Sequence, residues 1–336
     1  MKLFRVLAFS TIFLFILTGC AEKKKETETV NISAPRRYYS PEEYYPPYET
    51  LFFENGKGYE IRNENSDKLI IPLGGGPGWR SAIGRPEERI GGGRLIDMLL
   101  PLHEDYNIFI PEKFNWEPGL YYLYDIHARE RYTVDIILAG YAGVINEYLS
   151  RNNYETIIIA GFSEGALLLP ELYFQLDEFY KITALISIAG GGLSDYEQYE
   201  IRLIKLLSEE KPFTEPYIND PAGYIEMIET GFSMYSEEPY PDSIERFGTV
   251  TMRWLTSIMF RRPFDFYTDI EIPVLFIHGE MDTNVPVEST KYVEKNLPDK
   301  PFDFIYYPEM AHGSVTKEEL DRLRSDIANW LKEKGL

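Results

Sequence analysis

The sequence predicts an α/β fold in which a mainly parallel central sheet is flanked by helices on both faces. The first observation is that short apolar runs of strand length alternate with longer segments of helical periodicity along most of the chain. The second is that strand-like runs such as Lys68–Leu73 end directly in glycines, as strands of such sheets often do before a tight turn. The third is size, because 336 residues with 44% hydrophobic content allow one large domain with an insertion.

The individual elements follow from local patterns. Two short strands at 51–53 and 59–62 flank Asn-Gly-Lys-Gly, which is typical of a hairpin. The segment 132–149 places apolar residues at helical spacing along one stripe, so we expect an amphipathic helix there. Pro170 should kink the helix that follows residue 163 or end it early. We expect further strands at 68–73, 106–110, 156–160, 182–189, 272–278 and 302–307, and further helices at 94–100, 164–179, 287–296 and 317–334.

One block interrupts this alternation. Residues 193–265 contain no clear strand and are broken repeatedly by prolines, so they read as short helices. We interpret the block as a helical cap inserted into a core made of residues 51–192 and 266–336. Its aromatic and methionine side chains would suit packing onto that core or the wall of an apolar pocket.

The N-terminus has the composition of a targeting segment. Lys2 and Arg5 precede an apolar run at 6–17 that is too short to span a bilayer comfortably. Residues 1–19 are therefore predicted to be a signal peptide, and residues 20–50 to be a tether whose charged part at 21–30 is solvated and whose Tyr- and Pro-rich part at 38–50 lies extended across the domain.

The signal peptide ends in Leu-Thr-Gly-Cys, which resembles the lipobox of bacterial lipoproteins. The resemblance implies cleavage before Cys20, lipidation of that cysteine, and an exported protein anchored to the cell membrane on its periplasmic or outer surface. The alternative is a plain signal peptide that happens to end in cysteine. Cys20 is the single cysteine of the chain, so no disulfide can form within it.

Charge and composition exclude several classes of function. The formal net charge of −20 would repel nucleic acid, so we expect no nucleic-acid partner. Four histidines and one cysteine leave few metal ligands, and neither H-E-x-x-H nor a phosphate-binding G-x-x-x-x-G-K-[ST] occurs. We therefore expect no metal and no cofactor.

A candidate nucleophile lies between a strand-like and a helix-like run. Gly161-Phe162-Ser163-Glu164-Gly165 reads G-x-S-x-G after the apolar residues 156–160. This placement is that of a nucleophile elbow, a sharp turn that presents a serine at the end of a strand. The alternative is a serine in an ordinary glycine-rich loop.

Two further loops supply a possible base and its orienting acid. Asp282 lies in H-G-E-M-D-T-N-V-P after the penultimate expected strand, and His312 lies in A-H-G after the last one. With these motifs in this order, residues 50–336 resemble the α/β-hydrolase superfamily of serine hydrolases. The resemblance implies that Ser163 is the nucleophile, His312 the general base and Asp282 the residue that orients it. His103, His127 and His278 have no such place in the pattern.

The glycines after the strand at 68–73 complete the pattern. Gly74-Gly75-Gly76-Pro77-Gly78 resembles the H-G-G-P-G segment in relatives of prolyl aminopeptidases, with Gly74 in place of the histidine. The resemblance implies an oxyanion-hole N–H from Gly76, or from Gly75 if the loop is shifted. The second donor would be the backbone N–H of Glu164, whose side chain we expect to cap the helix or face solvent.

The sequence as a whole therefore predicts a serine hydrolase that cleaves an ester or amide bond in a small-molecule or peptide substrate, similar to an esterase or an aminopeptidase. The alternative is a non-catalytic surface binding protein that keeps the same fold. Reaction of Ser163 with an active-site probe would separate the two, because only an activated serine reacts.

Overall fold

The computed structural model describes residues 48–54, 56–75, 93–112, 133–208, 246–247, 250–282, 284–312 and 316–336. The predicted signal peptide, Cys20, most of the tether, His127 and Gly76 lie outside the described residues. None of the helices in the described ranges combines the length and apolar character needed to cross a bilayer.

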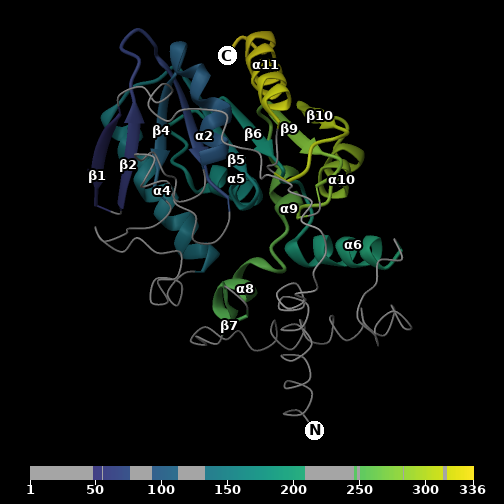
Figure 1. Ribbon diagram of the computed structural model, residues 1–336. Helices are drawn as coiled ribbons and strands as arrows, with labels where there is room; N and C mark the ends of the chain where they lie inside the picture. The colour runs from purple at the N-terminus through teal and green to yellow at the C-terminus, as the bar shows by residue number, and fades with distance from the viewer. Residues whose placement is uncertain are drawn as a thin grey trace, which may run out of the picture.

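A mainly parallel sheet forms the centre of the molecule (Figure 1). Within the described residues it has eight strands in the order β1-β2-β4-β3-β5-β6-β9-β10, and β2 runs antiparallel to both of its neighbours. The other pairings, from β4 to β10, are parallel. The strands are β1 (Glu49–Phe53), β2 (Gly56–Ile61), β3 (Lys68–Leu73), β4 (Asn107–Pro111), β5 (Thr156–Phe162), β6 (Ala184–Ile188), β9 (Val274–Gly279) and β10 (Phe302–Tyr307).

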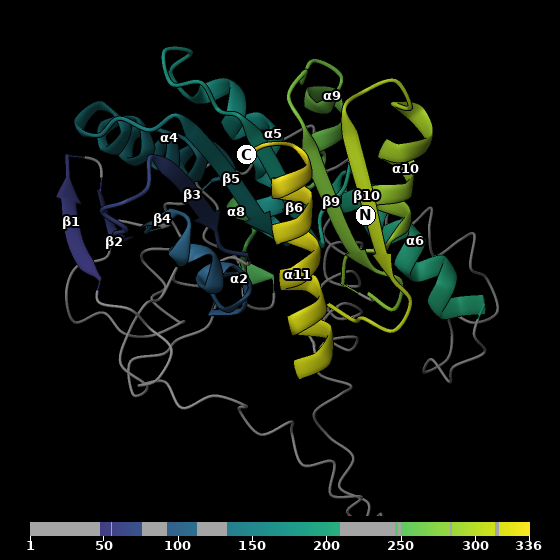
Figure 2. The ribbon, with the colours of Figure 1, turned by 90° about the horizontal axis from the view of Figure 1, so that it is seen from above.

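Helices cover both faces of this sheet, which confirms the predicted fold class (Figure 2). One face carries α2 (Gly93–Leu99), the 3-10 helix η3 (Leu100–Glu104) and α11 (Lys317–Glu333), and the other carries α4 (Val134–Arg151), α5 (Glu164–Gln175), α9 (Pro263–Tyr267) and α10 (Glu288–Asn296). The strands contribute side chains to a hydrophobic core on each face of the sheet, because successive side chains point to opposite faces. In β5, Ile157 and Ile159 pack under α4 and α5, whereas Ile158 packs on the side of α2 and α11.

The predicted cap is described only in part. It contains α6 (Asp195–Ser208), the paired strands β7 (Arg246–Phe247) and β8 (Val250–Thr251), and α8 (Met252–Ile258). The prediction of a block without strands was therefore wrong at β7 and β8. Helices α6 and α8 lie beyond one end of the sheet, where α8 packs against α4 and its Ile258 joins the core on that face (Figure 1).

Several predicted boundaries also differ from the structure by a few residues, such as β2, which begins at Gly56 rather than at residue 59. The sheet begins at Glu49 rather than at residue 51, because Glu49 and Thr50 already pair with β2, so the tether cannot extend to residue 50. Helix α5 continues through Pro170 to Gln175 and stops before the predicted residue 179. A proline removes one helical hydrogen bond, and α5 retains a buried apolar side that includes Leu169 and Leu172, which holds it against the core.

Candidate active site

Ser163 occupies a strained turn between β5 and α5. Its φ of 55° and ψ of −120° lie in a region that residues with a side chain rarely adopt. The turn is possible because its two flanking glycines have no side chains. A Cβ on Gly161 would lie 2.5 Å from the Gly165 carbonyl oxygen, and one on Gly165 would lie 2.3 Å from the Leu73 carbonyl oxygen. The G-x-S-x-G segment is therefore the sharp strand-to-helix turn that the sequence predicted.

The structure brings Ser163, Asp282 and His312 together at the carboxyl ends of the parallel strands. Asp282 follows β9 and His312 follows β10, and both strands lie on the β6 side of β5 in the sheet. The Nε2 atom of His312 is 3.0 Å from Ser163 Oγ, and its Nδ1 atom is 2.7 Å from Asp282 Oδ2. The imidazole thus bridges the hydroxyl and the carboxylate.

The carboxylate of Asp282 is buried and well supplied with donors. Its Oδ1 atom accepts hydrogen bonds from the backbone N–H groups of Asn284, at 2.8 Å, and Val285, at 2.9 Å. Burial by itself would raise the pKa of Asp282, but the nearby His278, the hydrogen bond to His312 and the Val285 N–H together outweigh burial, so that pKa lies well below the usual aspartate range. Asp282 is therefore ionised at neutral pH.

An ionised Asp282 determines which nitrogen of His312 carries the proton. A carboxylate only accepts hydrogen bonds, so Nδ1 of His312 is the protonated nitrogen and donates to Oδ2. In the neutral ring Nε2 then has a free lone pair directed at the Ser163 hydroxyl. This tautomer is the one that can accept a proton from Ser163.

The loops of Asp282 and His312 are tied to each other through the backbone. The N–H of Met281 donates to the Met310 carbonyl at 3.2 Å, and a Cβ on Gly279 would lie only 2.0 Å from the same oxygen. The second residue of the H-G-x-x-D pattern is therefore glycine because the histidine loop passes directly against it. This contact keeps Asp282 within reach of His312.

Phe162 is a contributor that the sequence analysis did not identify. Its ring lies 5.2 Å from the His312 ring between centroids, at an interplanar angle of 33°. Because Phe162 directly precedes Ser163, the same turn positions the serine and supports the imidazole. No sequence signal singles it out, since this position of G-x-S-x-G accepts any residue.

The predicted oxyanion donors are described in part. A Cβ on Gly75 would lie 2.8 Å from Ser163 Cβ, so the backbone of Gly75 passes directly beside the serine. Glu164 is the first residue of α5, where the helix dipole favours negative charge. The side chain of Glu164 is buried, with the residue 5% exposed, so of the two predicted positions, helix cap or solvent-facing, the solvent-facing one was wrong.

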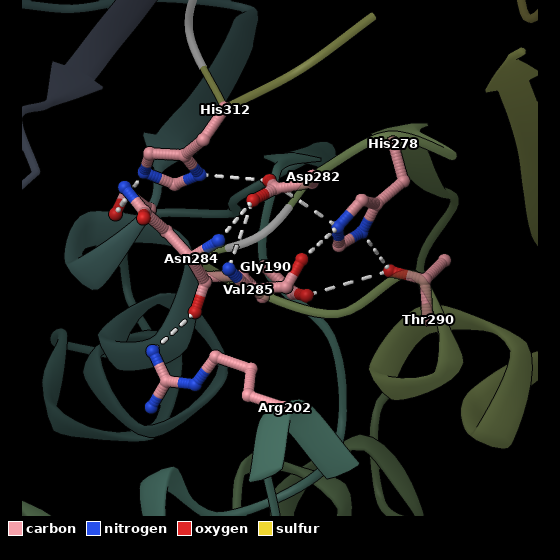
Figure 3. A network of polar contacts seen from close by, with 9 residues as sticks. Gly190, Arg202, His278, Asp282, Asn284, Val285, Thr290 and His312 are labelled. Carbon is pink, nitrogen blue, oxygen red and sulfur yellow. Dashed lines mark hydrogen bonds and ion pairs between the residues drawn. The ribbon is translucent and has the colours of Figure 1, made fainter. Parts of the chain in front are cut away.

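His278 lies on the other side of Asp282, although the sequence analysis gave it no role. It is fully buried in β9, and its Nε2 atom is 3.6 Å from Asp282 Oδ2 (Figure 3). His103 belongs to η3 and pairs its Nδ1 with the Leu100 carbonyl. Among the described residues, no group of three or more His, Cys, Asp or Glu side chains is placed to hold a metal ion.

The predicted cap contacts this site through α6. The Nη1 atom of Arg202 donates to the Asn284 carbonyl at 2.6 Å, two residues after Asp282 (Figure 3). Arg262, before α9, pairs with Glu197 of α6 at 3.0 Å. These contacts place the base of the predicted cap beside the loop that carries Asp282.

Comparison with known proteins bears on the family and the fold. Residues 232–335, which include Asp282 and His312 and make up less than half of the chain, match the model of the prolyl oligopeptidase family. The uncharacterised peptidase YtmA of Bacillus subtilis (strain 168) is 36% identical over 76 residues. That match covers 22% of this chain and only 29% of the relative. The matched family is the prolyl oligopeptidases, whereas the glycine loop resembles that of prolyl aminopeptidase relatives.

Solved structures cover most of the chain at low identity. The Pyrococcus furiosus esterase Pf2001 has 19% identity and a TM-score of 0.52, over 88% of this chain and 93% of its own. Est1E from Butyrivibrio proteoclasticus has 16% identity and a TM-score of 0.54, over 85% and 98%. The Pyrococcus horikoshii acylaminoacyl peptidase has 17% identity and a TM-score of 0.51, over 85% of this chain and 40% of its own. The sheet order, the strained serine turn and these likenesses together establish that the chain has the α/β-hydrolase fold.

Proposed function

We propose that this chain is a serine hydrolase that cleaves ester or amide bonds through an acyl-enzyme at Ser163. The observation that carries the proposal is the His312 imidazole, which spans Ser163 Oγ at 3.0 Å and Asp282 Oδ2 at 2.7 Å. A serine hydroxyl is a weak nucleophile until a base accepts its proton, and this arrangement supplies the base and the acid that orients it.

Each group has a defined part in the reaction. Ser163 Oγ attacks the substrate carbonyl carbon while its proton passes to Nε2 of His312, and the carbonyl oxygen becomes negatively charged. His312 then returns that proton to the departing alcohol or amine, which leaves the acyl group on Ser163. Water repeats the sequence and releases the acid. Asp282 holds Nδ1–H throughout and stabilises the imidazolium.

The backbone beside Ser163 is suited to stabilise the negative oxygen. Donors aimed at the developing charge are worth most in a fixed, water-excluded position. The N–H of Glu164 belongs to the positive end of α5, and Gly75 lies against Ser163. We assign the oxyanion hole to the N–H of Glu164 and to the glycine loop at Gly75 or Gly76.

Reaction with a fluorophosphonate probe tests the activity directly. The wild-type chain is expected to be labelled at Ser163, and the Ser163→Ala and His312→Ala variants should lose turnover by a factor on the order of 10⁴–10⁶. His103→Gln is a matched histidine control, because His103 pairs with a backbone carbonyl in η3, and it should label like wild type. A wild-type chain that folds but does not label would instead support a non-catalytic binding protein.

The substrate class can be narrowed by similarity to the solved structures. Est1E has been solved with ferulic acid bound, and an acylaminoacyl peptidase of similar fold with Z-Gly-Gly-Phe-chloromethyl ketone. We propose small esters and short peptide amides as the substrate class of this chain. Turnover of p-nitrophenyl esters, a feruloyl ester and aminoacyl p-nitroanilides should be compared, with Ser163→Ala as the blank. Turnover of none of them above that blank would contradict the proposed class.

We also propose that the protein is exported and held at the membrane by lipid on Cys20. The support is the sequence alone: two basic residues, an apolar run and Leu-Thr-Gly-Cys at positions 17–20. Growth with a labelled fatty acid should label the wild-type protein, and Cys20→Ala should abolish both labelling and cleavage at that site. Equal labelling of the two proteins would contradict the anchor.

A further inference from the structure

The buried histidine of β9 is held in a single orientation. His278 is 0% exposed, and a buried imidazole must find hydrogen-bond partners to offset the loss of water. Its Nε2 atom is 2.9 Å from the Val285 carbonyl oxygen, and its Nδ1 atom is 2.7 Å from Thr290 Oγ1. Both ring nitrogens are therefore occupied, one by the loop that carries Asp282 and the other by α10.

These partners determine where the proton of the neutral ring lies. A carbonyl oxygen only accepts, so Nε2 carries the hydrogen and donates to Val285. Nδ1 then accepts from the Thr290 hydroxyl, whose alternative acceptor is the Gly190 carbonyl at 3.4 Å. The short contact of Thr290 with Nδ1 keeps the Nε2–H tautomer pointing at the loop.

Val285 connects this histidine to the carboxylate of Asp282. Its C=O accepts from His278, and its N–H donates to Asp282 Oδ1 at 2.9 Å. The Nε2 atom of His278 also lies 3.6 Å from Oδ2, the oxygen that accepts from His312. In Figure 3, His278 and His312 approach Asp282 from opposite sides.

We propose that His278 is a positioning residue for the reaction at Ser163. It holds the loop after Asp282 through the Val285 carbonyl, and its Nε2 lies 3.6 Å from the carboxylate that orients His312. This inference rests on the proposed hydrolase function. It assigns to the histidine of H-G-x-x-D an effect on the rate of the chemical step, exerted through Asp282, in addition to filling space in the core.

The consequence of losing the N–H follows from geometry. An apolar side chain of similar size would fill the site but leave the Val285 carbonyl without its donor, so the turn would relax and Asp282 would shift relative to His312. Misplacing a catalytic group by about 1 Å can cost roughly 100-fold in rate. Because His278 does not face the substrate, the loss should fall on kcat, and KM should change little.

Three substitutions separate the donor from the volume. In His278→Gln the side-chain amide N–H reaches the position of Nε2, in His278→Asn it stops short of Val285, and in His278→Leu there is no donor. Each variant, together with wild type and the control His103→Gln, is assayed for kcat and KM on p-nitrophenyl acetate. The rate of fluorophosphonate labelling and the melting temperature are measured alongside.

We expect His278→Leu and His278→Asn to lose about 10–100-fold in kcat with KM within about threefold, and His278→Gln to recover to within about threefold of wild type. If His278→Leu does not fold, the comparison of Gln with Asn retains the test, since both are polar amides. Equal activity of these two folded variants would overturn the proposal. Wild-type protein that fails to label would instead refute the hydrolase function itself.

Discussion

Gly75 offers a direct test of how the glycine loop serves Ser163. Its φ is not in the left-handed region, so the need for glycine at this position is steric. A Cβ there would lie 2.7 Å from the Phe162 carbonyl oxygen and 2.8 Å from Ser163 Cβ. Both atoms belong to the rigid turn between β5 and α5, so in Gly75→Ala the glycine loop is the part that must move.

The size of the effect can be worked from these distances. Ordinary contact begins near 3.4 Å, so the loop must withdraw by about 0.7 Å from the Phe162 oxygen. A donor placed at about 2.9 Å from the oxyanion would then be at about 3.6 Å, which is no longer a hydrogen bond. Losing one oxyanion donor costs about 100–1,000-fold in kcat, and overpacking costs about 1–3 kcal/mol of stability.

The assay is steady-state hydrolysis of p-nitrophenyl acetate with urea unfolding on the same samples. Gly140→Ala is the matched control, because a Cβ on this glycine of α4 meets nothing within 4 Å. The control should keep full activity and gain up to about 1 kcal/mol, since alanine is the better helix residue. A Gly75→Ala variant with kcat within about threefold of wild type would refute the placement of the oxyanion donor.

Two further predictions concern strain and ionisation. Ser163→Gly should unfold in urea with about 1–2 kcal/mol more stability than Ser163→Ala, because glycine relieves the φ of 55° and alanine does not; equal stability would argue against strain. Burial, and next the neighbouring Asp105, raise the pKa of Tyr106 to about 12. The folded state therefore keeps a proton that the unfolded state loses above about pH 10, so Tyr106 should reduce stability progressively between those values. In urea unfolding at rising pH, the wild-type protein should lose stability relative to Tyr106→Phe over that window, because the variant has no hydroxyl to ionise.

Much of the fold and the candidate site could be predicted from local sequence. The strands at 68–73 and 302–307 were placed correctly, because β-branched and aromatic runs between turn signals identify buried strands without knowledge of their neighbours. Ser163, Asp282 and His312 were found because each lies in a short motif after a strand. Parallel strands bring their carboxyl ends to one edge of the sheet, and this rule together with the resemblance to the α/β-hydrolase superfamily predicted that these residues would meet.

Other features depended on contacts between distant segments. Pro170 argued for an early end to α5, but packing of Leu169 and Leu172 into the core carries the helix past it. The start of the sheet at Glu49 was missed because its pairing with β2, not its own composition, defines that strand.

The residues that surround Ser163, Asp282 and His312 also depend on contacts between distant segments. Phe162 meets the His312 ring and Gly279 meets Met310 only when β5, β9 and β10 lie in register. Local sequence identified Ser163 because a strained turn and its flanking glycines leave a signature, and the loop motifs with their family resemblance identified Asp282 and His312. Only the folded chain shows which residues hold these side chains in place, because hydrogen bonds and close packing across strands depend on distances that no local pattern encodes.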